Sequence, residues 1–212
     1  MSGNFGTINE LHLDVFREIG NIGSSSAATA LSKIVENKVT LSLPKVAILG
    51  FDEITKVLGG EETQVMGIMQ PMHGDLSGNI MFLLGLPQAH ELASLLLRQM
   101  LNYTVPASDD IGLFTEMEQS ALREIGNIMI SSYLSAISAM TNLKITPAVP
   151  ELATDMAAAI LSVLAIEFGK LGDHVLYISN EFLQDNIKVG GDFFLVPDVT
   201  SYGTLLNALG VS

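Results

Sequence analysis

Apolar and polar positions predict a long helix near the start of the chain and a second one just beyond its middle. Asp14, Glu18 and Asn21 are spaced i, i+4 and i+7, which places them in one polar stripe along the first helix. An apolar stripe runs beside it and consists of Val15, Ile19 and Ile22. The apolar stripe predicts the face that holds this helix to the protein body, and the polar stripe lies along its edge.

The second helix repeats the first 106 positions later and without a gap. The hexapeptide Arg-Glu-Ile-Gly-Asn-Ile is identical at 17–22 and 123–128, so the polar stripe recurs as Ser120, Glu124 and Asn127. Duplication explains the register, but a packing role alone requires only apolar residues of suitable size. The retention of Glu and Asn in both copies therefore indicates a site that exists twice. The alternative is an ordinary solvated helix face.

A glycine stands between Glu and Asn in each copy, as Gly20 and Gly126. Glycine inside a helix costs about 1 kcal/mol relative to alanine, so its presence needs a cause. Two causes are considered: close packing of the two helices against each other, or room for a partner to approach the Glu and Asn side chains.

Capping residues bound both long helices. Thr7 with Glu10 and Thr115 with Glu118 have the spacing of a capping box, and Asn is suited to the left-handed turn that ends a helix. The ends are expected near Asn37 and Asn142. The remaining pattern predicts a short strand, a helix, two strands and a final helix in each half. Their expected ranges are strands 39–43 and 144–149, helices 51–59 and 154–169, strands 62–72, 76–86, 174–183 and 187–196, and helices 87–101 and 199–209.

The order of elements is therefore α-β-α-β-β-α, twice. Adjacent strands joined by short turns pair antiparallel. The sequence predicts an α/β (α+β) fold in which pseudo-two-fold halves share one antiparallel sheet flanked by helices. We expect a single domain over 1–212, with halves at about 1–105 and 106–212 and a link over 102–112.

Composition limits the partners. The chain has 212 residues, is 48% hydrophobic and carries a formal net charge of −13. Nucleic acid and anionic membranes need basic patches, so neither is an expected partner, whereas a cationic protein surface is compatible. There is no cysteine and no signal-peptide pattern, and the apolar stretch 156–168 is too short to span a bilayer and predicts a buried helix. We expect a soluble cytoplasmic protein.

The repeated Glu and Asn do not make a complete active site. An Asn can orient a water through its amide, and a Glu can act as a base or pair with a cation. No metal cluster is expected, because the histidines lack ligand spacing; they are His12, His73, His90 and His174. Segment 23–27 lies within a helix and lacks the final glycine of a nucleophile elbow, and segment 190–192 is better explained as a turn or bulge than as a phosphate loop. For catalysis, the substrate must supply the electrophile and any metal.

The pattern Asp/Ser-x-x-x-Glu-x-x-Asn, separated by 22 residues from a Pro, resembles the signature of the CheC–CheX–FliY phosphatases of bacterial and archaeal chemotaxis. It occurs twice at one offset, and the repeat topology covers the whole chain. Two intact motifs are most similar to the CheC branch of that family. The matching positions are Asp14, Glu18, Asn21 and Pro44 in the first copy, and Ser120, Glu124, Asn127 and Pro150 in the second.

The resemblance implies a protein phosphatase that hydrolyses the aspartyl phosphate of the response regulator CheY. In this family the motif Glu pairs with a regulator lysine and the motif Asn positions the attacking water, so the implied catalytic residues are Glu18, Asn21, Glu124 and Asn127. The resemblance further implies that Mg²⁺ comes with the phosphorylated regulator, that this chain binds no cofactor, and that CheD is a partner, with part of helix 156–168 as a candidate docking face. The alternative is a non-catalytic adaptor of the same fold that binds CheY or CheD. Intact Glu and Asn in both motifs favour the enzyme.

Overall fold

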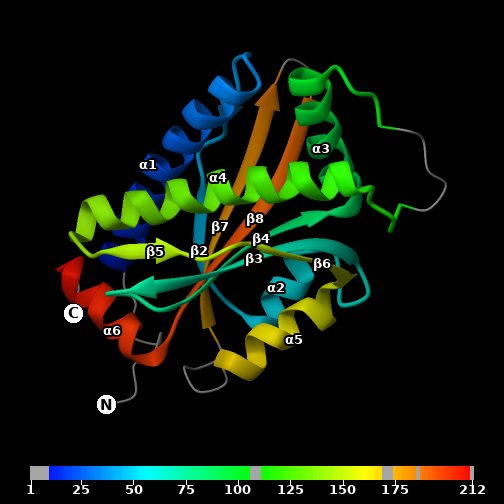
Figure 1. Cartoon of the computed structure of the whole chain (residues 1–212). Helices are drawn as coiled ribbons and strands as arrows, with labels where there is room; N and C mark the ends of the chain where they lie inside the picture. Colours follow the sequence, from blue (N-terminus) through cyan, green and yellow to red (C-terminus); the bar gives the residue numbers. More distant parts are fainter. Residues whose placement is uncertain (1–9, 106–110, 169–173, 185–186, 211–212) are drawn as a thin grey trace.

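The computed structural model describes residues 10–105, 111–168, 174–184 and 187–210. Within these residues, each half contains three helices and four strands in the order α-β-β-α-β-β-α (Figure 1). The first half consists of α1 (Glu10–Ile34), β1 (Thr40–Leu41), β2 (Lys45–Gly50), α2 (Phe51–Val57), β3 (Gln64–Gly74), β4 (Gly78–Gly85) and α3 (Leu86–Leu101). The second consists of α4 (Glu116–Thr141), β5 (Ile145–Pro147), β6 (Glu151–Met156), α5 (Ala157–Phe168), β7 (His174–Gln184), β8 (Ile187–Pro197) and α6 (Val199–Ala208).

Two strands are absent from the predicted elements, because the sequence pattern predicts a helix, at 51–59 and at 154–169, as the next element after each motif proline. In the structure Pro44 and Pro150 interrupt extended chain rather than end it, and β2 and β6 follow them. A proline removes one backbone donor and is compatible with a break in a strand, so the chain resumes pairing after it. The second helix of the second half consequently starts at Ala157, later than the expected 154.

The strands form one antiparallel sheet in which the halves interleave. The order is β1-β7-β8-β4-β3-β5, with β2 also paired to β7 and β6 also paired to β3. The prediction of a shared antiparallel sheet is confirmed. However, β1 and β2 of the first half pair with a strand of the second, and β5 and β6 pair with a strand of the first. Each half therefore completes the other half's part of the sheet.

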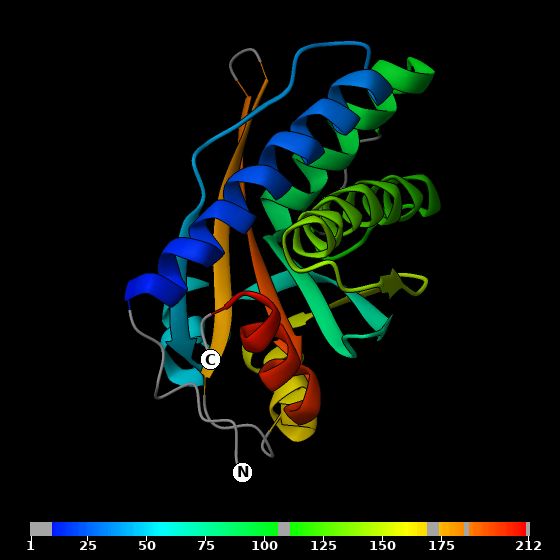
Figure 2. The same cartoon turned by 90° about the vertical axis from the view of Figure 1, so that its left-hand side faces the viewer.

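The two motif helices α1 and α4 cross each other over this sheet (Figures 1 and 2). At the crossing, a Cβ added to Gly23 would lie 2.5 Å from Cδ1 of Tyr133, so the tyrosine ring occupies the place of a side chain. The repeat counterpart of Gly23 is Met129 and that of Tyr133 is Ala27. The first copy thus carries the small residue at both positions and the second copy the large one, so α1 leaves room for the Tyr133 ring and the two helices approach closely. The serine-rich segment after Gly23 is part of α1, as expected.

A buried polar cluster ties α1, α4 and β7 together beneath this crossing. The Ser24 hydroxyl donates to Asn180 Oδ1 at 2.7 Å and lies 2.8 Å from the Tyr133 hydroxyl, which accepts from Asn180 Nδ2 at 2.6 Å. All three side chains are buried. Burial raises the pKa of Tyr133 to about 12, so it stays neutral and donates or accepts hydrogen bonds as a phenol.

The centre of the sheet is aromatic where β4 meets β8. Phe82 and Phe193 stack with ring centroids 4.3 Å apart, and a Cβ at Gly191 would lie 2.3 Å from Cε2 of Phe82. The expectation of a turn or bulge at 190–192 is wrong, because these residues continue β8 and pair with β7. Glycine is used here for the close approach of an aromatic ring.

Helix ends follow the capping predictions in the second half more closely than in the first. Thr115 and Glu118 form a capping box, and α4 ends at Asn142 with a left-handed φ of 59°. In the first half α1 ends at Ile34, and Glu36, not Asn37, has the left-handed φ of 49°. The Thr7 half of the other predicted capping box lies outside the described residues.

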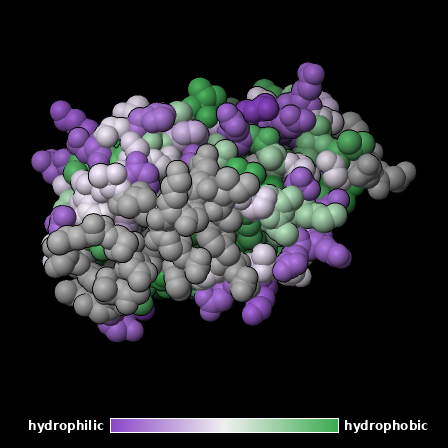
Figure 3. All heavy atoms as spheres, turned by 90° about the horizontal axis from the view of Figure 1, so that it is seen from below, coloured by the Kyte–Doolittle hydropathy of each residue, from purple (hydrophilic) through white to green (hydrophobic). Residues whose placement is uncertain are grey.

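Helix α5 is one-sided in its described first turns rather than buried all round. Ala157 and Leu161 are buried, whereas Val163 is 46% exposed and the preceding Met156 is 49% exposed. Seen from below, the coloured part of the surface shows hydrophobic residues between hydrophilic ones (Figure 3). Within the described residues, every helix is too short or too polar to span a lipid bilayer.

Candidate functional site

The polar stripe of α4 runs along the exposed edge of the helix and meets strand β3 at its last residue, Asn127. Ser120 and Glu124 are exposed and Asn127 is half-buried at its edge. On the opposite side, the side chains of Leu122 and Ile125 are 0% and 1% exposed. The helical period thus presents Glu124 and Asn127 together, one turn apart, on a rigid element.

The first copy has the same arrangement on α1. Asp14, Glu18 and Asn21 are exposed, while Phe16 and Ile19 are 1% exposed and anchor the helix. We call the Glu18–Asn21 pair centre 1 and the Glu124–Asn127 pair centre 2. Each predicted Glu–Asn pair lies on one helix surface, and the two pairs are on different helices.

The glycine of each motif faces the protein body. A Cβ at Gly20 would lie 3.0 Å from Cγ of the motif residue Pro44, and one at Gly126 would lie 2.7 Å from Cγ2 of Ile68. Both glycines are buried. They allow close packing, but against strand residues and Pro44, so helix–helix contact and room for a partner are both wrong as explanations. In centre 1 the motif residue Pro44 therefore packs against the helix at Gly20.

Centre 2 has a buried support that the sequence interpretation missed. Gln70 on β3 is 0% exposed; its Nε2 donates to Asn127 Oδ1 at 3.1 Å and to the Ala148 carbonyl at 2.6 Å. These bonds restrain the Asn127 amide while leaving its NH₂ group and a second lone pair of Oδ1 available. The signal in the sequence is a single amide in the apolar run of β3.

Centre 1 lacks the corresponding support. Strand pairing identifies the residue of the first half's site that corresponds to Gln70. Ser179 lies opposite the first residue of β2, and Met69 lies opposite the first residue of β6. The next residues along these strands, Asn180 and Gln70, are therefore equivalent in the repeat. Asn180 is engaged by Ser24 and Tyr133 instead. Among the described residues, the Asn21 side chain makes no hydrogen bond. The two motif amides are therefore held differently.

The motif's first position also differs between the centres. Arg17 Nη1 donates to Asp14 Oδ1 at 2.5 Å, and the same Nη1 lies 3.8 Å from Glu10 Oε2. This exposed pair neutralises Asp14 locally, and Ser120 takes its place in centre 2. Within the described part of the chain, neither Glu18 nor Glu124 forms an ion pair, so both carboxylates are free to bind an external cation.

The site has the chemistry of a partial active centre. Each pair offers a carboxylate for a cation and an amide that can hydrogen-bond a water or a phosphoryl oxygen. Across the described ranges, no three His, Asp or Glu side chains come together as a metal site. Of the four histidines, His73 is exposed and His90 bonds to Glu118, while the side chains of His12 and His174 lie outside the described residues.

A groove that many hydroxyl side chains line adjoins centre 1. Residues of α1 and of the segment before β2 enclose about 390 Å³ between them. Asn21 and Pro44 line it at one end, and hydroxyl side chains dominate the rest of its polar lining. These are Ser24, Ser25, Thr29, Ser32, Thr40 and Ser42.

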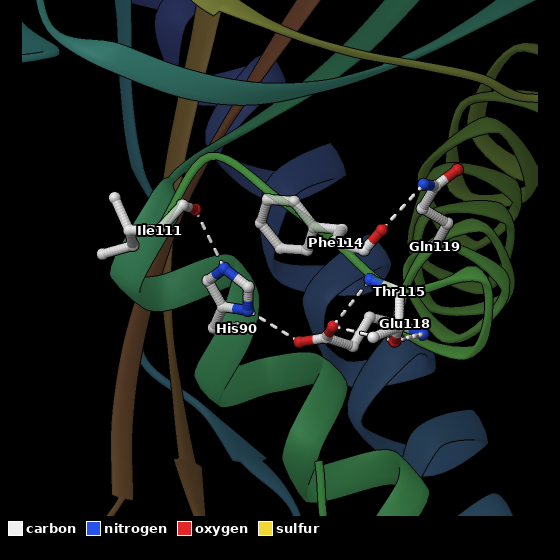
Figure 4. A network of polar contacts seen from close by, with 6 residues as sticks. All are labelled: His90, Ile111, Phe114, Thr115, Glu118 and Gln119. Atoms are coloured by element: carbon white, nitrogen blue, oxygen red, sulfur yellow. Dashed lines mark hydrogen bonds and ion pairs between the residues drawn. The ribbon is translucent and has the colours of Figure 1, made fainter. Parts of the chain in front are cut away.

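The N-terminus of α4, about two turns before centre 2, is fixed by a polar network (Figure 4). Glu118 is 1% exposed; its Oε1 lies 2.6 Å from His90 Nδ1, and its Oε2 accepts from the Thr115 N–H at 2.9 Å. His90 Nε2 lies 2.9 Å from the Ile111 carbonyl oxygen, and its ring stacks on Phe114. The network joins α3, the segment before α4 and α4 itself.

We expect this network to make part of the stability depend on pH. Burial raises the pKa of Glu118, but hydrogen bonds from the Thr115 backbone and from His90 outweigh it, so the pKa lies below its ordinary value of 4.5. A lowered pKa in the folded state gives stabilisation that is present above the unfolded pKa and is lost as pH falls through the folded one. Glu118→Gln should lower the free energy of unfolding by about 1–3 kcal/mol at pH 7.

Urea unfolding from pH 7 to pH 3 measures this effect. The difference between native chain and Glu118→Gln should shrink as the pH falls below 4.5. Glu116→Gln, at an exposed acidic position in the same helical turn, is the matched control and should change stability little. A difference that is constant with pH contradicts the ionised state of Glu118.

Comparison with known proteins places this arrangement in a family. The model of the CheC-like family matches residues 11–48 and 117–153, which contain both motifs. The CheY-P phosphatase CheC of Bacillus subtilis is 32% identical over 210 residues, or 98% of each chain.

Solved structures agree in fold. The FliY structure from Thermotoga maritima has a TM-score of 0.73 at 17% identity and covers 96% of this chain and 98% of its own. The FliM middle domain of H. pylori has a TM-score of 0.68 at 15% identity and covers 95% and 99%. With the two motifs, the full-length relative and the shared sheet, the chain belongs to the CheC-like family.

Proposed function

We propose that this chain is a phosphatase that hydrolyses the aspartyl phosphate of the chemotaxis response regulator CheY. The observation that carries the proposal is the pair of Glu–Asn centres at equivalent surface positions of the repeat, neither of which has a metal cluster or an adjacent nucleophile among the described residues. A substrate that brings its own electrophile suits such a centre. The relative of 32% identity, described as a CheY-P phosphatase, supports the same assignment.

In this proposal the two proteins share the work. Glu18 or Glu124 pairs with a lysine of the regulator and fixes the complex, while Asn21 or Asn127 enters the regulator's site. The amide orients a water for in-line attack on phosphorus, the bond between phosphorus and the aspartyl oxygen breaks, and inorganic phosphate leaves. Asp14 and Ser120 modulate the charge beside Glu, and Pro44 and Pro150 shape the chain next to the helix.

Substoichiometric turnover tests the proposal against its alternative. With phosphorylated CheY in large excess, an enzyme accelerates phosphate release until all CheY is dephosphorylated. A non-catalytic adaptor binds CheY or CheD and leaves the rate of release unchanged. Binding without acceleration therefore rejects the phosphatase and retains the adaptor.

We expect the two centres to act separately and unequally. Asn21→Ala and Asn127→Ala should each leave partial activity, because each centre presents its own Glu–Asn pair. The chain that keeps Asn127 should retain the larger share, since Gln70 already restrains that amide and less freedom is lost in the complex. The kcat of each single variant measures this. Complete loss in one single variant contradicts two independent centres.

Mg²⁺ should belong to the partner rather than to this chain. Calorimetric titration of the isolated protein with MgCl₂ is expected to show no stoichiometric binding, while dephosphorylation requires Mg²⁺ in the presence of CheY. The reason is that the Glu–Asn pair supplies one carboxylate, fewer oxygen ligands than Mg²⁺ prefers. Tight stoichiometric binding to the isolated chain overturns the shared-site proposal.

CheD is proposed as a second partner, and the cytoplasm as the place where both partners are met. The exposed Met156 and Val163 at the start of α5 support a docking face there. A groove of about 190 Å³ between β6 and α5 adjoins these residues.

A further inference from the structure

An aliphatic groove adjoins centre 2. It encloses about 280 Å³ between the C-terminal turns of α3 and the first half of α4. Both helices are labelled in Figure 1. Apart from two motif residues and one alanine, the lining consists of leucine and methionine side chains. The lining residues are Leu96, Leu97, Met100, Leu101, Met117, Ser120, Ala121 and Glu124.

The end of α3 carries apolar side chains beside the groove that do not pack against the protein body. Leu96 and Leu97 are 3% and 5% exposed and hold α3 to the body. Met100 and Leu101, at the end of the same helix, are 51% and 59% exposed. Single exposed apolar residues are common, but two that border a groove form a patch typical of a contact surface.

The groove is continuous with centre 2. Ser120 and Glu124 belong both to its lining and to the polar stripe that ends at Asn127. A partner cation that reaches the free Glu124 carboxylate must therefore lie across the groove or beside it. The neighbouring surface of that partner meets the leucine and methionine side chains.

The groove is also preformed. The contact between His90 Nδ1 and Glu118 Oε1, 2.6 Å long, joins the first turns of α3 to the first turn of α4 (Figure 4), and Met117 of the groove lining is the neighbour of Glu118 in the chain. Because the two helices that form its walls are held together, little order has to be created on binding. Centre 1 differs, since the groove beside Asn21 has hydroxyl groups in its lining where this one is aliphatic.

We propose that the α3–α4 groove receives an apolar side chain of the response regulator, next to the cation that pairs with Glu124, and so forms a docking subsite of centre 2 alone. The proposal rests on the proposed function for its partner. The Glu124 carboxylate favours a cation and the leucine and methionine lining favours an apolar group, so the occupant is an apolar side chain beside a lysine, on the surface that carries the phosphorylated site. The subsite contributes affinity and leaves the chemical step to Asn127.

The test combines a groove variant with single-centre chains. Met100→Gln with Leu101→Gln keeps side-chain length and helix-forming tendency and removes the apolar surface. In the Asn21→Ala chain, where only centre 2 turns over, this change should raise the KM for phosphorylated CheY about tenfold and leave kcat within about twofold. In the Asn127→Ala chain, where only centre 1 turns over, KM should stay the same.

Val57→Gln is the matched control, because Val57 is 47% exposed on α2 and lies outside the groove. It should leave the KM of both single-centre chains unchanged. An unchanged KM for the groove variant in the Asn21→Ala chain overturns the proposal. An equal rise in both single-centre chains also overturns it, because the effect is then a general disturbance.

Two further measurements identify the occupant of the groove and separate docking from turnover. If sedimentation shows that the native chain is a dimer and the groove variant a monomer with unchanged KM, the groove is occupied by a second copy and the proposal fails. Affinity for CheY carrying beryllofluoride in place of phosphate gives a readout without turnover. The affinity is measured in a Glu18→Lys chain, because this change prevents centre 1 from pairing with the regulator's cation and leaves binding to centre 2. If no chain is active but the groove variant weakens this affinity tenfold, the docking subsite is supported and the phosphatase function is rejected.

Discussion

Replacing both motif asparagines, Asn21→Ala with Asn127→Ala, should reduce the stimulated dephosphorylation of CheY by about 100-fold or more. An oriented hydrogen-bonding group at the reacting atoms is typically worth this factor, and alanine has no amide to orient a water. Binding should persist, because Glu18 and Glu124 still pair with the regulator's cation. The rate of phosphate release and the affinity for CheY are the two quantities to measure.

The fold of this double variant should be retained. Alanine is a better helix former than asparagine, and Asn21 makes no side-chain hydrogen bond among the described residues. Removal of Asn127 takes one acceptor from Gln70 Nε2, which still donates to the Ala148 carbonyl, so a cost of about 1 kcal/mol is expected. Full activity in a folded double variant contradicts the role assigned to the amides.

Gly23→Met should lower the free energy of unfolding by about 3 kcal/mol or more, the second large effect. A Cβ at this position lies 2.5 Å from the buried ring of Tyr133, so any side chain forces α1 and α4 apart. Methionine is the residue that the repeat itself carries at this place, as Met129. Urea unfolding at neutral pH measures the change.

Gly203→Met in α6 is the matched control, because no atom lies within 4 Å of its added Cβ. This control should be neutral or slightly stabilising. Combining Gly23→Met with Tyr133→Ala, the reciprocal residue of the repeat, should cost less than the sum of the two single changes. Additive costs, or a Gly23→Met chain as stable as native, contradict the packing assigned to the crossing.

The helices and the candidate site followed from local pattern. The spacing predicts that Glu and Asn share one helix surface, and the structure shows this: Glu18, Asn21 and Glu124 are exposed and Asn127 is half-buried. A helical stripe depends only on nearby residues, so local pattern suffices to predict it. The sharing of the sheet was also anticipated. The interleaving of the halves was not, since the pairing of β2 with β7 joins segments far apart in the chain and leaves no trace in local periodicity.

The residues that distinguish the two centres could not be predicted for the same reason. Gln70 lies on a strand and Asn127 on a distant helix, and their contact exists only after the halves interleave. The packing partner of Gly20 could likewise not be predicted, because Pro44 reaches the glycine only in the folded chain. A single buried amide in an apolar strand is the one local sign that such a support exists.

The decay of phosphorylated CheY with and without this protein tests the central claim most directly. With Mg²⁺ present and phosphorylated CheY in excess, the account predicts that a small amount of the native chain accelerates loss of the aspartyl phosphate over many turnovers. Decay at the same rate with and without the native chain, while the two proteins bind, would contradict it.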